Sequence, residues 1–107
     1  MSVLVRSYDD ISIECDTNYG KYIINGVNYV PCTIKGRDLD RAINILKNYI
    51  LGNAVLKELI INALSNDEVS IKIPVTVLSK GKSIGEIVDS LVYLLIGVRQ
   101  CLNTLDK

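Results

Sequence analysis

The C-terminal region of the chain carries an apolar pattern that predicts one long helix, from Ile84 to about Leu105. Apolar residues recur there at spacings of three and four over about three heptads. At its start, Ser83-Ile84-Gly85-Glu86 fits the capping box, in which serine and glutamate side chains each accept a hydrogen bond from the other's backbone N–H. So broad an apolar face needs more than one neighbour to cover it, and this constrains the rest of the fold.

The apolar face of this helix divides into two overlapping seams. The first contains Ile84, Ile87, Leu91, Leu94, Val98, Cys101 and Leu105, and the second contains Val88, Leu91, Leu95, Val98, Leu102 and Leu105. At 1.5 Å per residue the helix would be roughly 33 Å long, enough to exceed the width of a five-strand domain. We expect one seam to meet the sheet and the other a second copy of the chain, because two-fold dimers are the commonest oligomers. The predicted dimer interface is Val88, Leu91, Leu95, Val98 and Leu102. The alternative is that the whole face is monomer core.

Alternating apolar and polar residues predict strands in two regions of the chain. Residues 3–5, 11–15, 22–24 and 27–30 supply the first region, and residues 69–77 supply the second. Asn25-Gly26 is the preferred pair for a type I′ hairpin turn, and it sets Ile24 opposite Val27 and Tyr22 opposite Tyr29. Proline cannot donate to a sheet ladder. We therefore expect the strand before Pro31 to stop there or lie at an edge, and the strand containing Pro74 to be an edge or bulged.

Two further helices are predicted between these regions. The first runs from Leu39 to Leu51 with Asp38 as its N-cap, and the second from Ala54 to about Leu64 with Asn53 as its N-cap. The inward residues of the first are Leu39, Ala42, Ile43, Leu46 and Ile50. The expected fold is a single α+β domain over residues 1–107, in the order ββββααβα. It is a two-layer sandwich, with an antiparallel sheet of about five strands and an αα-hairpin and the long C-terminal helix on one face.

Charge and residue usage narrow the classes of function. The formal net charge is zero, so no global field steers the chain onto nucleic acid or an anionic membrane. Histidine is absent, which excludes His-based triads and His-ligated metals. The apolar run at 91–98 is bracketed by Asp89 and Arg99 and is too short to span about 30 Å of hydrocarbon. Near the N-terminus Arg6, Asp9 and Asp10 interrupt any signal-like run, and we expect a cytoplasmic protein without membrane contact.

The three cysteines are Cys15, Cys32 and Cys101. None of them forms a CxxC pair, so we expect no zinc site. Cys15 and Cys32 lie in predicted neighbouring strands, where a disulfide is conceivable. The favoured interpretation is three buried free thiols in a reducing cytosol.

A loop and a helix pair are the candidate ligand sites. Lys80, Gly81, Lys82 and Ser83 lie between a strand and a helix, where two lysines and helix N–H groups would suit an anion. A P-loop is excluded, since Thr76 stands where the first Walker A glycine belongs. The pair of helices around Gly52-Asn53 is either a helix-turn-helix or an αα-hairpin, and we favour the αα-hairpin, because Lys57 and Glu58 cancel on the second helix. The carboxylates Asp9, Asp10, Glu14 and Asp16 are expected to face water.

These observations favour a small non-enzymatic homodimeric interaction or regulatory protein. Heavy use of Ile, Asn and Lys suggests an AT-rich genome, and hence an archaeal or viral accessory factor. The alternative is a nucleic-acid-binding protein with a basic patch from Lys72, Lys80, Lys82, Arg37 and Arg41. We predict no catalytic residue, cofactor or metal.

Overall fold

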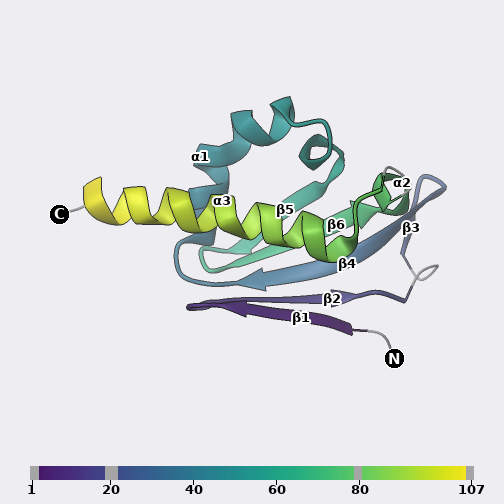
Figure 1. Cartoon of the computed structure of the whole chain (residues 1–107), viewed down its shortest axis with the longest axis horizontal. Helices are drawn as coiled ribbons and strands as arrows, with labels where there is room; N and C mark the ends of the chain where they lie inside the picture. The colour runs from purple at the N-terminus through teal and green to yellow at the C-terminus, as the bar shows by residue number, and fades with distance from the viewer. Residues whose placement is uncertain (1–2, 19–21, 79–80, 106–107) are drawn as a thin grey trace.

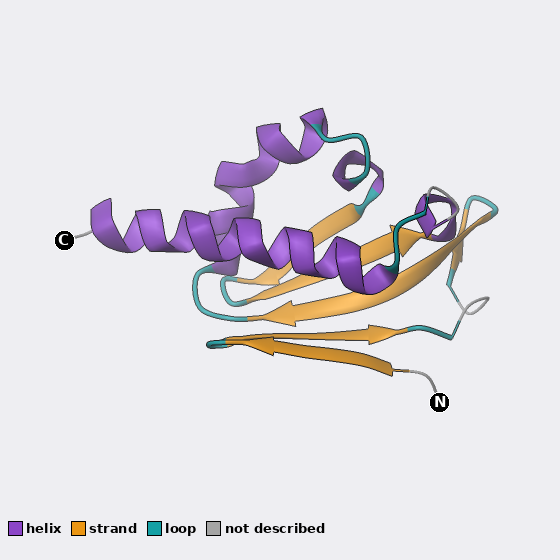
Figure 2. Ribbon diagram, in the orientation of Figure 1, coloured by secondary structure: helices purple, strands orange, loops and turns teal. Residues whose placement is uncertain are grey.

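A sheet covered on one face by helices makes up the domain (Figures 1 and 2). The computed structural model describes residues 3–18, 22–78 and 81–105. The strands are β1 (Val3–Tyr8), β2 (Ile11–Asp16), β3 (Ile23–Ile24), β4 (Val27–Lys35), β5 (Ile60–Ser65) and β6 (Glu68–Pro74). The helices are α1 (Leu39–Gly52), the 3₁₀ turn η1 (Leu56–Glu58), α2 (Val75–Leu78) and α3 (Ile84–Leu105). The expected α+β architecture, an antiparallel sheet with the long C-terminal helix, is confirmed.

The sheet has the strand order β1-β2-β4-β6-β5, and β3 pairs with β4 outside this path. Each neighbouring pair is antiparallel. Alternation of side chains buries one face of the central strands, which is the face that α1 and α3 cover. The core residues from these strands are Ile11, Ile13 and Cys15 of β2, Val30, Cys32 and Ile34 of β4, and Val69, Ile71 and Ile73 of β6. No described helix covers the opposite face of the sheet (Figure 1).

The Asn25-Gly26 hairpin forms as its sequence predicts. Both turn residues have positive φ, 50° for Asn25 and 79° for Gly26, as a type I′ turn requires. Ile24 lies opposite Val27, and the Tyr29 N–H donates to the Tyr22 carbonyl at 2.8 Å. The local sequence therefore sets the register of this hairpin.

Both prolines lie within the sheet, and the expectation for Pro31 was wrong. Strand β4 continues through Pro31 to Lys35 and lies between β2 and β6, not at an edge. The ladder between β2 and β4 ends at the pair Cys15 and Cys32, one residue before Pro31. Because no β2 residue pairs with Pro31, the missing N–H of the proline leaves no carbonyl of β2 without its hydrogen bond. Pro74 ends β6, and the β5 ladder stops two residues before it, at Lys72. The expected strand over 69–77 is therefore correct only as far as Pro74, after which α2 begins.

The predicted second helix over 54–64 does not form. Residues 56–58 make the 3₁₀ turn η1, and the chain then enters β5, which pairs with β6 from Ile60 opposite Lys72 to Ser65 opposite Glu68. The observed order is therefore ββββαββα with η1 and α2 as short additions, and the described residues 39–65 form neither an αα-hairpin nor a helix-turn-helix. The apolar residues of this short segment fit both the helical and the strand period. The segment forms a strand because the edge of β6 is available to pair with it.

The predicted helix starts have two different outcomes. The Ser83–Glu86 capping box is confirmed: the Glu86 N–H donates to Ser83 Oγ at 3.1 Å and the Ser83 N–H to Glu86 Oε1 at 3.5 Å. Asp38 does occupy the N-cap position of α1, but it has φ 59° and its side chain makes no capping bond. Instead, the Asp38 N–H donates to Asp67 Oδ1 at 3.1 Å, which ties the start of α1 to the β5–β6 turn.

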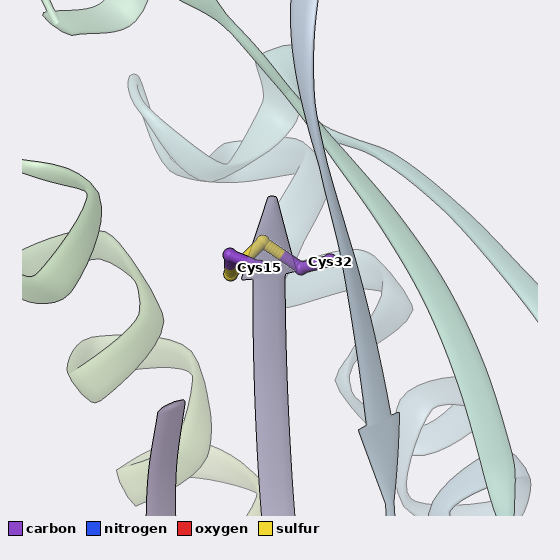
Figure 3. Close-up of a disulfide and its surroundings, with 2 residues drawn as sticks. All are labelled: Cys15 and Cys32. Carbon is purple, nitrogen blue, oxygen red and sulfur yellow. A yellow bond between two sulfur atoms is a disulfide. The ribbon is translucent and has the colours of Figure 1, made fainter. Parts of the chain in front are cut away.

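Cys15 and Cys32 form a disulfide between the neighbouring strands β2 and β4 (Figure 3). The two residues are direct register partners with a Cα–Cα distance of 4.0 Å, and both side chains are buried. Cys101, the free cysteine among the described residues, is exposed on α3. The expectation of three buried free thiols was therefore wrong, because the strand register places two of the thiols in contact and α3 turns the third outward.

Reducing this disulfide should lower the free energy of unfolding by about 3 kcal/mol, because it closes a chain segment of about 17 residues in the unfolded state. Urea denaturation with and without a reductant, followed by circular dichroism, measures the difference. Thiol titration of the unreduced, unfolded chain should find only the Cys101 thiol. Equal urea midpoints with and without reductant would contradict this prediction.

Candidate functional site

Helix α3 lies across the sheet beside α1, and its last turns extend past the strand ends in the view of Figure 1. Among the described residues, no helix combines the length and apolarity needed to cross a membrane. Of the predicted interface residues, Val88, Leu91, Leu95 and Leu102 are buried within the single chain, and Val98 is half-buried. The second seam therefore meets the sheet and α1. A dimer contact of α3 has to use the other side of the helix, where Leu94 is half-buried and Cys101 is exposed.

An apolar groove runs between α1 and α3 on the outer side of the helical layer. Two adjoining hollows of about 500 and 430 Å³ share Tyr93 and Leu94 as lining residues. We define the α1–α3 groove by the residues Ile45, Tyr49, Tyr93, Leu94, Gly97 and Cys101. Three of its side chains are largely exposed: Tyr93 at 72%, and Ile45 and Tyr49 at 53% each. Large apolar side chains gathered on a surface are a feature of many protein contacts, so this groove is the candidate site.

The local sequence explains why these residues point outward. In α1, Leu46 and Ile50 face the core, so Ile45 and Tyr49, one position earlier in each case, lie toward α3 and the solvent. In α3, a side chain at Gly97 would meet nothing within 4 Å, so the helix backbone itself is accessible from the groove. Tyrosines beside an accessible backbone suit a close apolar contact such as another helix.

The groove offers little for catalysis. Its polar rim consists of Asn53, Lys82 and Ser90, and Asn53 Oδ1 already accepts the N–H groups of Val55 and Leu56 at 2.9 Å. No cluster of three or more His, Cys, Asp or Glu residues able to hold a metal occurs in the described part of the chain. The arrangement is thus suited to binding an apolar surface.

An ion pair between the buried Arg99 and the exposed Asp10 joins α3 to the loops at one end of the sheet. Arg99, whose side chain is 8% exposed, contacts both carboxylate oxygens of Asp10, with Nη1 at 2.9 Å from Oδ2. Its Nη1 also donates to the Arg37 carbonyl at 3.2 Å, and the Arg37 N–H donates to Asp10 Oδ2 at 3.0 Å. The bond from the Arg37 N–H is the largest cause that lowers the pKa of Asp10; burial opposes it, and the bonds from Arg99 add to the lowering. Asp10 is exposed, as its sequence position predicted, and its carboxylate in addition pairs with the Arg99 guanidinium.

A second polar cluster holds the edge strand β1 to α3. The Tyr8 hydroxyl donates to Asp89 Oδ1, and Arg6 Nε lies 3.8 Å from the same oxygen. The hydrogen bond to the Asp89 carboxylate is the main cause that raises the pKa of Tyr8, since it favours the protonated phenol. This cluster orients β1. Because the raised pKa keeps the phenol of Tyr8 protonated, it does not make Tyr8 a base.

The predicted anion loop is only partly described, because Lys80 lies outside the described residues. Gly81, Lys82 and Ser83 are exposed, and Lys82 lines one end of the α1–α3 groove. Ser83 and Glu86 already bond the first backbone N–H groups of α3, and the Glu86 carboxylate places a negative charge there. This charge is unfavourable to an anion.

The residues of the predicted basic patch that the structure describes do not all lie together, and Lys80 is outside the described residues. Lys72 is in the middle of the sheet, opposite Pro31 of β4 and Ile60 of β5, whereas Arg37 follows the far end of β4. The Arg37 backbone takes part in the Asp10 network, and Arg41 is on the first turns of α1. One continuous basic surface from these residues is therefore not formed in the described structure.

Comparison with protein-family models, with curated proteins and with solved structures found no match to this chain. The assignment of the groove and of the Arg99–Asp10 pair therefore depends on the geometry alone. Sequence reasoning missed Arg99 as a structural residue and missed Ile45 and Tyr49 as exposed residues of a groove. A charge at an inward helical position was the one signal that could have singled out Arg99, and its partner at Asp10 could not be read from spacing.

Proposed function

We propose that this chain is a non-enzymatic homodimeric interaction protein, and that the α1–α3 groove is the surface where two copies meet. The exposure of Ile45, Tyr49 and Tyr93 along a continuous apolar groove is the observation that carries the proposal. The zero formal net charge supports a second copy as the occupant, since identical chains do not repel each other at long range. This places the contact on the outer side of α3, not on Val88, Leu91, Leu95 and Leu102.

A single substitution in the groove should dissociate the dimer without unfolding the chain. We expect wild type to have twice the mass of the 11.8 kDa chain at low micromolar concentration, and Tyr93→Asp and Ile45→Asp to be monomeric. Both side chains are exposed in the monomer, so the carboxylate stays hydrated until a partner would bury it. Native mass spectrometry or light scattering measures the mass, and circular dichroism checks the fold.

Asn44→Asp is the matched control, because it adds the same charge on α1 at an exposed position outside the groove. It should remain dimeric. Gly97→Gln separates binding from folding. Removing a glycine from the helix should stabilise the monomer by about 0.5–1 kcal/mol. The new side chain would at the same time fill the groove and block the second copy. A monomeric wild type, or a Tyr93→Asp chain that keeps the dimer mass, would contradict the proposal.

Salt dependence separates this proposal from the nucleic-acid alternative. An apolar contact should change little between roughly 50 and 300 mM salt, whereas binding through phosphate contacts would weaken steeply over that range. Retention of mixed nucleic acid that is lost with salt would favour the alternative instead.

A further inference from the structure

A different surface, the free edge of β1, has unused hydrogen-bonding groups in a regular array. Among the strands that the structure describes, β1 pairs with β2 alone, and the six register pairs run without a shift. In Figure 1, β1 is the outermost strand at the lower side of the sheet. An edge of this kind is a template for another strand.

The hairpin geometry identifies the free groups. The two-residue turn Asp9-Asp10 makes Tyr8 and Ile11 the bonded pair that closes the β1–β2 hairpin. Bonded and non-bonded pairs alternate along an antiparallel ladder. Leu4, Arg6 and Tyr8 therefore bond to β2, while Val3, Val5 and Ser7 direct their N–H and C=O groups away from the sheet.

This edge lacks the protection that the opposite edge has. Strand β5 carries a bulge between Ala63 and Ser65, which interrupts a regular ladder. In β1 the register is continuous, proline is absent, and the one charged residue is Arg6. The Arg6 side chain lies on the helix-covered side of the sheet, next to Asp89. Its charge is therefore not on the open face, where Val3 and Val5 lie, 43% and 60% exposed.

We propose that a second copy of this chain adds its β1 to this edge, antiparallel about a two-fold axis at Val5. With the axis there, Val5 opposes the second copy's Val5, and Val3 opposes its Ser7. This register brings every free N–H and C=O of Val3, Val5 and Ser7 into a bonded pair, whereas an axis at Val3 or Ser7 leaves part of them unused. The two sheets then continue as one, and the exposed valines cover each other. The contact goes beyond the proposed function, since it involves neither α1 nor the outer side of α3.

The strength of this contact follows from its size. A single pair of short strands buries far less than the roughly 800 Å² per partner of a stable interface. We therefore expect association through β1 only at high concentration, about 0.5 mM, where the groove contact is already saturated. Using Tyr93→Asp as the background isolates it, because that variant is monomeric at micromolar concentration if the proposed groove contact holds.

A charge placed at position 5 tests the axis directly, because a residue on a two-fold axis meets its own copy. In the Tyr93→Asp background, Val5→Lys and Val5→Asp should each weaken high-concentration dimerisation at least about tenfold, since like charges then lie directly opposite. An equimolar mixture of the two should restore a dimer that contains one chain of each. Sedimentation equilibrium and native mass spectrometry measure the association and the composition.

The controls separate this contact from misfolding and from the groove. Val5→Thr keeps the β-branched side chain and the N–H and should dimerise like its background, and Asn62→Lys on β5 should have no effect. A mixture that stays monomeric, or an Asn62→Lys variant as impaired as Val5→Lys, would overturn the assignment. If the Tyr93→Asp background itself remains dimeric at micromolar concentration, it is the groove proposal that fails, and the Val5 variants in wild type still test the edge.

Discussion

Leu95→Asp should abolish the fold and not merely release a partner. The Leu95 side chain is 0% exposed, on the side of α3 that contacts the core, next to Leu91 at 1%. A carboxyl group there must either lose its hydration as a charged group or take up a proton, and either cost is a large part of the roughly 5–15 kcal/mol that stabilises an ordinary domain. Circular dichroism should show no cooperative unfolding transition for this variant. Leu95→Ala, which only leaves a cavity, should still fold with a loss of about 3 kcal/mol.

Tyr93→Asp is the matched control for this prediction. It introduces the same charge on the same helix, two residues away, at a side chain that is 72% exposed. We expect it to fold. A Leu95→Asp chain that folds as a monomer with wild-type circular dichroism would place Leu95 at an interface and contradict the burial described above.

Loss of the Asp10 carboxylate should destabilise the domain more than loss of the Arg99 guanidinium. Asp10→Ala leaves the 8%-exposed Arg99 without its charge partner, and we expect a loss of about 3 kcal/mol, the lower end for breaking a buried pair because Asp10 is 45% exposed. Arg99→Met leaves an exposed carboxylate that water can solvate, and should cost only about 1–2 kcal/mol. Urea denaturation of both variants and of the double variant gives the coupling between them. If both variants lose the same stability, an unpaired Arg99 costs no more than an unpaired Asp10. That result would mean that water solvates the guanidinium and would contradict the burial of Arg99.

The same pair makes stability depend on pH. The pKa of Asp10 is lower in the folded chain than its ordinary value of 3.8. Its stabilising contribution is therefore complete above that ordinary value and is lost as the pH falls through the lower, folded value. Asp10→Asn should flatten this part of the acid dependence, which denaturation at a series of pH values measures.

Particular residues show how far local sequence reaches in this fold. Asn25-Gly26 sets the hairpin register, and Ser83 with Glu86 sets the start of α3, because each depends on backbone groups only a few residues away. Residues 54–64 have a helical apolar pattern, but they form η1 and the strand β5. Their conformation depends on pairing with β6, which the local pattern does not contain. Pro31 was expected to end its strand and did not, because the end of the β2 ladder is a property of the assembled sheet.

The candidate site divides in the same way. The sequence by itself determined that the C-terminal helix is long, where it begins and that its apolar face is unusually broad, because helical periodicity and capping are local. Only the tertiary structure decided which side of that face is core. Packing on the sheet and on α1 buries Val88, Leu91, Leu95 and Leu102, and leaves Tyr93 and Cys101 outside. It also brought Arg99 to Asp10 and Cys15 to Cys32, since contacts between residues distant in sequence depend on strand order and register, which no local pattern specifies.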